Sequence, residues 1–368
     1  MDTRIIKHAE ILMNYSLALK KGEKILIQGD VSTLPMLKEC YRQALKLGAF
    51  PEIRLISDEL SEILLKSGSN EQIEYMPKSV IEAIEYTDAV LTFHGCSNTR
   101  ILNAVPAEKV KLLAKGRTEY LNKFYGREAA GKLRWCLSLY PTVALAQEAG
   151  MSLEDYSNFV YSSCLIGSKD PMKEWKRIES EQHKICAILN KKKNLHITSK
   201  DTDLKLSVEG RTWVNCCGKV NFPDGEIFTG PVEDSVEGYI TFSFPGIYTG
   251  NEIEGIRLEF KKGKVVKASA TKGEELLKQI LKTDEGASFV GEIAIGTNYS
   301  IQRFSKNMLF DEKIGGTVHL AIGRSIPGTG GKNSSAIHWD MLCDMKEEGR
   351  ILADGKLIYE NGAFKALK

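Results

Sequence analysis

The amino-terminal third of the chain alternates amphipathic stretches with short, continuous apolar runs. Apolar residues recur at helical spacing in residues 5–19 and 33–47, which predicts a helix in each. The apolar runs predict strands at residues 24–28, 52–56, 89–93 and 136–140. Such strands separated by helices are typical of a parallel sheet that is covered on both faces. We therefore predict a doubly wound α/β domain in this part.

The pattern changes after residue 141. Residues 141–194 have helical spacing, with Ser152 and Asp155 as the start signal of one helix and Pro171 at the start of another. From residue 195 onward the alternation is that of β-strands, which are predicted at residues 204–208, 239–244, 253–260 and 265–270. We therefore predict an α+β fold for the carboxyl half, and two domains, residues 1–190 and 191–368.

Glycines mark the turns of this second half. Gly263 and the pair Asp354-Gly355 each predict a hairpin turn between two strands. Residues 317–322 and 336–342 predict two further strands, which a glycine-rich segment connects. These last two strands contain the residues with the clearest chemical meaning.

The composition is that of a soluble globular protein that is long enough for two domains. Of the 368 residues, 42% are hydrophobic and 27% are charged. The net charge of +2 gives no electrostatic reason to expect a nucleic acid or an anionic membrane as a partner. No apolar run is long enough to span a bilayer, and the charged first 20 residues do not resemble a secretory signal, so we expect a cytoplasmic protein.

The eight cysteines fit a reducing compartment. They form no C-x-x-C pair and are too sparse for a disulfide scaffold, so we expect reduced thiols. Cys216 and Cys217 are adjacent, which raises the question of a metal or redox role. Because neighbours on a strand face opposite ways, packing is the expected use of this pair.

His338 and Asp340 lie two positions apart on a predicted strand. Their side chains therefore point to the same face, while Trp339 and its neighbours pack on the other. An imidazole and a carboxylate that converge on one point are ligands that zinc accepts. The alternative for an isolated H-x-D is a core histidine that is hydrogen-bonded to its neighbour.

Two glutamates stand in apolar surroundings where a solvated charge is not expected. Glu292 lies between two apolar segments that predict a short strand on either side of it. Glu226 lies beside Ile227 and Phe228, which we expect to be buried. A carboxylate seldom goes inside a protein unless it is paired or binds a metal. Singly, each could be an exposed turn residue, whereas together with His319, His338 and Asp340 they favour a binuclear metal site.

Four sequence blocks resemble the thermophilic-type aminopeptidases, the metallopeptidase family of aminopeptidases T and S. In chain order they are G-E-I-F-T-G-P, G-E-I-A-I-G, D-E-K-I-G-G-T-V-H-L-A-I-G and S-S-A-I-H-W-D. The resemblance extends over essentially the whole chain. It implies a homodimeric two-domain enzyme that removes amino-terminal residues from peptides, with two divalent metal ions held by Glu226, Glu292, His319, His338 and Asp340.

The resemblance also suggests roles for two further positions, 312 and 326, and a second role for Glu292. Glu312 corresponds to a glutamate that joins the metal shell in the family, although its separation from His319 is two residues longer; the alternative is a turn carboxylate that pairs with Lys313. Glu292 is assigned the catalytic proton transfer. Position 326 is isoleucine where the family has a tyrosine that assists the reacting carbonyl, so another donor does this work or the activity is altered.

The expected chemistry is hydrolysis by a metal-bridged hydroxide, because two cations lower the pKa of a shared water toward neutrality. Zinc is the first expectation for the metal, and cobalt, manganese and magnesium fit the same ligands. Two alternatives remain at this point. One is a non-peptidase metal hydrolase or an inactive metal-binding relative, and the other is a ligand-binding α/β module without a metal.

Overall fold

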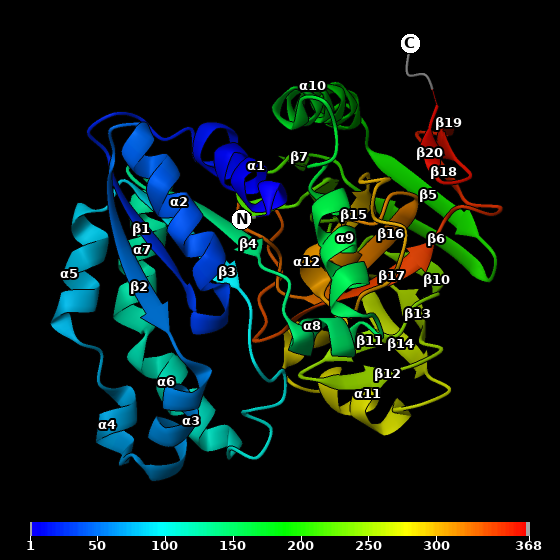
Figure 1. Cartoon of the computed structure of the whole chain (residues 1–368). Helices are drawn as coiled ribbons and strands as arrows, with labels where there is room; N and C mark the ends of the chain where they lie inside the picture. The colour runs from blue at the N-terminus through cyan, green and yellow to red at the C-terminus, as the bar shows by residue number, and fades with distance from the viewer. Residues whose placement is uncertain (1, 366–368) are drawn as a thin grey trace. The chain divides into compact units, whose positions relative to one another are not determined.

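The computed structural model describes residues 2–365, which form two compact units (Figure 1). One unit comprises Met1–Met172 with the later segment Gly218–Pro223, and the other comprises Lys173–Cys217 with Asp224–Lys368. The outermost positions of the two predicted domains, residue 1 and residues 366–368, lie outside the described part. Among the described helices, none combines the length and the apolar character that crossing a membrane requires.

The first unit contains a five-stranded sheet in the order β2-β1-β3-β4-β8, in which every neighbouring pair is parallel. Its strands are β1 (Lys24–Asp30), β2 (Phe50–Ile56), β3 (Ala89–His94), β4 (Arg134–Leu139) and β8 (Asn221–Phe222). Its helices are α1 (Thr3–Ile11), α2 (Leu34–Lys46), α3 (Asp58–Ser67), α4 (Asn70–Glu74), α5 (Lys78–Tyr86), α6 (Ala107–Gly116), α7 (Thr118–Ala129), α8 (Val143–Glu148) and α9 (Leu153–Ser163).

Helices cover both faces of this parallel sheet. On one face, Leu26 of β1 and Val90 of β3 form a buried cluster with Ile84 of α5, and Phe124 of α7 packs against it. Ile27 is the neighbour of Leu26 along the strand, so it is buried on the opposite face, where α2 contacts β1. This arrangement confirms the predicted doubly wound α/β fold.

The second unit is built mainly from antiparallel strands. Its strands are β5 (Asn194–Ser199), β6 (Thr202–Ser207), β7 (Val214–Cys216), β9 (Glu226–Thr229), β10 (Glu237–Thr241), β11 (Gly246–Tyr248), β12 (Asn251–Ile253), β13 (Arg257–Lys261), β14 (Lys264–Ser269), β15 (Val290–Gly296), β16 (Thr317–Gly323), β17 (His338–Asp344), β18 (Arg350–Ala353), β19 (Lys356–Glu360) and β20 (Ala363–Phe364). Its helices are α10 (Pro171–Leu189), α11 (Glu274–Ile280) and α12 (Met308–Asp311).

Two sheets of this unit share one hydrophobic core. An eight-stranded sheet has the order β14-β13-β10-β6-β5-β18-β19-β20, and a five-stranded sheet has the order β17-β16-β15-β9-β7. Ile197 and Leu204 of the larger sheet belong to the same buried cluster as Ile293 and Leu320 of the smaller one. The mixed helix and sheet content confirms the predicted α+β fold of the carboxyl half.

Two details differ from the sequence-based expectations. The single strand predicted at residues 253–260 is broken, because the chain turns at Gly255 with φ +63° and its two parts join different sheets, β12 with β11 and β13 with β10 and β14. Glu292 does not separate two strands. It lies within one continuous strand, β15, which has a register shift between Val290 and Glu292 opposite β16.

Candidate metal centre

One face of the five-stranded sheet carries the candidate ligands because side chains alternate along each strand. Ile293 and Ile295 of β15, like Leu320 of β16, point into the shared core. Glu292 and His319 occupy the alternate positions of these strands, so they project from the other face of the sheet. Both are buried all the same, with 5% and 0% of their surface exposed.

Each candidate ligand is paired with glycine or alanine on at least one neighbouring strand. In the strand register, Glu226 is paired with Gly296, His319 with Ala294, and His338 with Gly323. Ala321 lies between Glu292 and Asp340 and is paired with both. Each of these large side chains therefore has a small neighbour on one side, although His319 is also paired with Leu342 of β17. The small neighbours leave room above the sheet for the carboxylate and imidazole groups to converge.

His319 and the two buried glutamates form one cluster. The Nε2 atom of His319 lies 3.2 Å from Oε2 of Glu226 and 3.5 Å from Oε1 of Glu292. All three residues are buried, and their ligand atoms lie within 4.8 Å of one another. Three groups that can each donate an electron pair at this separation form a candidate site for one divalent ion.

His338 and Asp340 form a second cluster that also includes Glu292. Nε2 of His338 lies 3.5 Å from Oδ2 of Asp340 and 3.5 Å from Oε2 of Glu292. The other ring nitrogen, Nδ1, lies 2.7 Å from the backbone carbonyl oxygen of Arg324. When Nδ1–H donates to that carbonyl, Nε2 is free to act as a ligand, which is the usual arrangement of metal-binding histidines.

Glu312 lies close to one residue of each cluster. Its carboxylate belongs to a third group with His319 and Asp340, and it also accepts a hydrogen bond of 2.5 Å from Lys313. Both sequence-based interpretations of Glu312, a metal ligand and a partner of Lys313, are therefore compatible with its position.

The chemistry of the unsatisfied atoms fits a divalent cation. Among the described residues, the buried atoms Oε2 of Glu226, both ring nitrogens of His319 and Oδ1 of Asp340 have no hydrogen-bond partner. A buried carboxylate oxygen or imidazole nitrogen without a partner costs about 1–3 kcal/mol or more. A metal ion would satisfy Oε2 of Glu226, Nε2 of His319 and Oδ1 of Asp340 directly, whereas Nδ1 of His319, on the other side of the ring, needs a separate partner. These three atoms fit the group that the sequence implied.

The buried carboxylates make this site negatively charged and shift the pKa values of its titratable groups. Burial and the carboxylates of Asp340 and Glu226 raise the pKa of Glu292 above its usual value. Burial lowers the pKa of His338, but Asp340 and Glu292 outweigh this effect and raise it to about 9. In the absence of another cation, protons therefore bind strongly to this cluster, and a metal ion has to displace them.

Three residues at this site were not predicted from the sequence. Lys313 is completely buried, and its Nζ lies 2.6 Å from Oε1 of Glu226 and 3.8 Å from Oδ1 of Asp224. Cys216 was expected to serve packing, but its thiol forms a potential ligand cluster with Asp224 and Glu226. The strand register explains this position, because Cys216 is paired with Glu226. For Asp224, the i,i+2 spacing to Glu226 was the available sequence signal.

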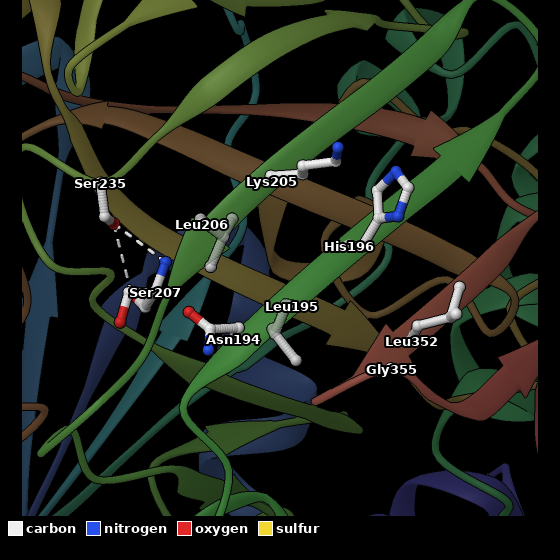
Figure 2. Close-up of a pocket in the computed structure, with 9 residues that line it drawn as sticks. All are labelled: Asn194, Leu195, His196, Lys205, Leu206, Ser207, Ser235, Leu352 and Gly355. Carbon is white, nitrogen blue, oxygen red and sulfur yellow. Dashed lines mark hydrogen bonds between the residues drawn. The ribbon is translucent and has the colours of Figure 1, made fainter.

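A separate hollow of about 350 Å³ lies on the eight-stranded sheet (Figure 2). It is lined by Asn194, Leu195, His196, Lys205, Leu206, Ser207, Ser235, Leu352 and Gly355. The one imidazole that lines it, that of His196, is paired with the exposed Asp203 at 2.9 Å. None of these lining residues is a carboxylate, so the hollow does not duplicate the ligand set of the five-stranded sheet.

Comparisons with known proteins agree with a metal-dependent site. The family described as thermophilic metalloprotease (M29) matches residues 1–364. Aminopeptidase 2 of Geobacillus stearothermophilus is 26% identical over 96% of this chain and 95% of its own length. Aminopeptidase PepS of Streptococcus thermophilus is 27% identical over 91% of each chain. The solved structure of wild-type AmpT from Thermus thermophilus superposes with a TM-score of 0.86 at 24% identity, covering 98% of this chain and 99% of that one.

Proposed function

Because the chain belongs to the thermophilic metalloprotease family M29 and is therefore a metal-dependent hydrolase of peptide bonds, we propose that it is an aminopeptidase with a binuclear metal centre. The activity is suggested by the relatives that match almost the full chain and are named aminopeptidases. The binuclear centre is suggested by the geometry of the five-stranded sheet.

The observation that carries the proposal is the pair of ligand clusters that meet at Glu292. One cluster consists of Glu226, Glu292 and His319, and the other consists of Glu292, His338 and Asp340. Two oxygens of a single carboxylate thus face two imidazoles, at 3.5 Å each. A carboxylate between two sets of ligands is well placed to serve two ions a few ångströms apart.

The charge balance supports two ions rather than one. Five carboxylates surround the site, and one ammonium group, that of Lys313, lies among them. With neutral imidazoles, four negative charges remain, and a bound hydroxide would add a fifth, so two divalent cations bring the site close to neutrality. A single divalent ion would leave two uncompensated charges in a buried region, which is costly in a low dielectric. The carboxylates are those of Asp224, Glu226, Glu292, Glu312 and Asp340.

The bound ions would supply hydroxide from a shared water at neutral pH, polarise the scissile carbonyl and accept the free α-amino group of the peptide. Glu292 is the residue that we assign to proton transfer from this water to the leaving amine. Its pKa is raised by burial and by neighbouring carboxylates, which suits a group that must both accept and release a proton. His338 is held by the Arg324 carbonyl, so its Nε2 keeps a fixed direction toward the ions.

We propose further that the enzyme works as a homodimer in the cytoplasm, with zinc as the first candidate metal and cobalt, manganese or magnesium as alternatives. The eight cysteines, which all lie within residues 2–365, form no disulfide bond, which suits a reducing compartment. Carboxylate oxygens and imidazole nitrogens accept each of these metals. Sedimentation analysis tests the oligomeric state, and metal analysis of protein purified without added metal tests the identity of the metal.

The test of the proposed activity is a reconstitution assay. The protein is stripped with a chelator and then incubated with an oligopeptide and each of the four metals. We expect release of the free amino-terminal residue with at least one metal, and no release from the same peptide after amino-terminal acetylation. Anomalous scattering at the zinc edge should reveal two peaks beside Glu292. No product with any of the metals would refute the proposal.

A weakened or altered peptidase activity is the second candidate, because the resemblance implies a tyrosine at position 326, where this chain has isoleucine. An isoleucine side chain donates no hydrogen bond to a developing oxyanion. Introducing the donor by the substitution Ile326→Tyr is the informative comparison. If Ile326→Tyr cleaves peptides markedly faster than the natural protein, this second candidate is favoured for the natural chain.

A further inference from the structure

Lys313 has an unusual position for a lysine. Its side chain is 1% exposed, and its ammonium donates hydrogen bonds to two carboxylates, at 2.6 Å to Oε1 of Glu226 and at 2.5 Å to Oε1 of Glu312. Oδ1 of Asp224 lies 3.8 Å away. A fully buried lysine without a functional reason is rare, because removal of an ammonium group from water is costly even when it is paired.

The ammonium occupies a place where a metal ion could otherwise bind. The thiol of Cys216 and the carboxylates of Asp224 and Glu226 lie within 4.8 Å of one another, which is the spacing of a metal cluster. A thiolate and two carboxylates are suitable ligands for a borderline or soft cation such as zinc or cadmium. The positive charge of Lys313 lies against two of these three groups.

The two oxygens of Glu226 are divided between Lys313 and the proposed metal site. Oε1 accepts the hydrogen bond from Lys313, whereas Oε2 lies 3.2 Å from Nε2 of His319 and has no hydrogen-bond partner. A carboxylate that is held on one side by a fixed donor has its other oxygen pointed in a defined direction. Lys313 therefore orients Oε2 of Glu226 toward the cluster with Glu292 and His319.

The backbone holds Lys313 and Asp224 together independently of their side chains. The N–H of Asn298 donates to the carbonyl of Lys313 at 3.0 Å, and its side-chain amide donates to the carbonyl of Asp224 at 2.8 Å. Asn298 itself is 3% exposed. The two segments are thus linked by buried hydrogen bonds, so the position of the ammonium among the carboxylates is built into the fold.

We propose that Lys313 is a built-in third cation of the metal centre: its ammonium occupies the Cys216–Asp224–Glu226 cluster, keeps a metal ion out of it, and positions Glu226 as a ligand of the two-ion site. This inference rests on the proposed metal centre. It assigns to Lys313 a positioning role that acts through Glu226, and it explains why a cysteine beside the centre is not one of its ligands.

The experiment uses cadmium as the probe, because a cadmium–thiolate bond absorbs in the ultraviolet and cadmium–carboxylate or cadmium–imidazole bonds do not produce that band. The stripped full-length protein and its variants are titrated with cadmium, and bound metal is counted after gel filtration. We expect the natural protein to saturate without any absorption that depends on Cys216, as judged against Cys216→Ser.

Removal of the ammonium should open the cluster. In Lys313→Met we expect one additional equivalent of cadmium, with the thiol proton displaced and a thiolate absorption that disappears in the double variant Lys313→Met/Cys216→Ser. Lys313→Arg retains the charge and should bind the same number of ions as the natural protein. Lys267→Met, which removes an exposed lysine from the other sheet, is the matched control and should change nothing.

Each outcome of this experiment decides a separate point. Failure of the natural protein to bind any metal would overturn the proposed metal centre itself. Normal binding by the natural protein with an unchanged count and no thiolate band in folded Lys313→Met would overturn only the role of Lys313. If Lys313→Met does not fold, the natural protein and Lys313→Arg decide the question. A Cys216-dependent absorption band in the natural protein at saturation with cadmium contradicts the proposed role of Lys313. Absence of this band in both proteins supports that role.

Discussion

The two larger sheets of the second unit contain the same kind of ion pair in opposite settings. On the eight-stranded sheet, His196 lies 2.9 Å from Asp203, and their side chains are 34% and 51% exposed. On the five-stranded sheet, His319 lies 3.2 Å from Glu226, and their side chains are 1% and 6% exposed. One pair is in contact with water, and the other is surrounded by protein.

This difference distinguishes charged groups that only lie at the surface from charged groups that the proposed function uses. Water screens the exposed pair and can replace either partner, so such a pair contributes at most about 1 kcal/mol to stability. The buried pair has no such replacement, and its unsatisfied atoms are tolerated only if another group binds there. The location of an acid or a histidine therefore indicates function more clearly than its identity does.

The largest expected effect is loss of stability when the buried lysine is removed. Lys313→Met leaves Glu226 and Glu312 without their cation, so we expect the free energy of unfolding to fall by about 3–5 kcal/mol in the metal-free protein. Lys267→Met removes a 69% exposed lysine that pairs with Glu259, and it should change stability by less than about 0.5 kcal/mol. Urea unfolding of both variants checks the contrast, and equal losses would contradict it.

The next effect concerns turnover. Glu292→Gln keeps the shape of the side chain but cannot transfer a proton, so we expect kcat to fall by at least about a hundredfold, or roughly 2.7 kcal/mol in the barrier. Steady-state kinetics on an aminoacyl substrate, with metal content measured in the same samples, checks this. Glu259→Gln on the other sheet is the control. Undiminished turnover by a metal-loaded Glu292→Gln protein would remove Glu292 from the proposed mechanism.

A third effect is a loss of stability at alkaline pH that depends on metal removal. His338 has a pKa of about 9 in the folded protein against 6.5 for an ordinary histidine, so its proton stabilises the fold fully below pH 6.5 and is lost as the pH approaches 9. We expect the chelated protein to lose roughly 2 kcal/mol between pH 7 and 9 from this group.

Glu312, whose pKa burial raises from 4.5 to about 8, acts in the same direction, because the folded protein holds this proton more tightly than the unfolded chain, so stability falls as the pH rises from 4.5 to about 8. His338→Gln isolates the histidine contribution and should flatten the dependence. Saturating zinc should also flatten it, since the ion takes the place of the proton. The prediction fails if urea unfolding shows an identical pH dependence for the chelated natural protein and His338→Gln.

The smallest effect is expected on the exposed sheet. A double-mutant cycle with His196→Ala and Asp203→Ala should give a coupling energy below about 1 kcal/mol. Kinetic constants of these variants should equal those of the natural protein. A coupling energy of several kcal/mol at this exposed pair would remove the distinction between the two sheets.

Local sequence rules were sufficient for much of the fold. The hairpin turns at Gly263 and Asp354-Gly355 and the cap of α9 at Ser152 are confirmed. The alternation rule also placed His338 and Asp340 on one face of β17, with Trp339 on the other. These features depend on neighbours a few residues apart, so the information is contained in the local pattern.

The site residues that were not predicted from the sequence reach the site through contacts between distant segments. Lys313 follows a glutamate in a turn, and this local context is that of a solvated charge. Only the contact with Glu226, 87 residues earlier, makes it a buried cation. Likewise Cys216 has no metal-binding motif, and its thiol reaches the site because β7 pairs with β9. Sequence spacing alone reveals neither the ion pair nor the strand pairing.

The order of the strands also affects when the site can exist during synthesis. Glu226 is made early, Glu292 and His319 follow, and His338 and Asp340 are supplied by β17, near the end of the chain. A nascent polypeptide lacks the second ligand cluster until nearly all of it has left the ribosome. In the proposed two-ion centre, capture of the second ion therefore depends on the last part of the chain to be made, and a polypeptide released before residue 338 lacks His338 and Asp340 for it.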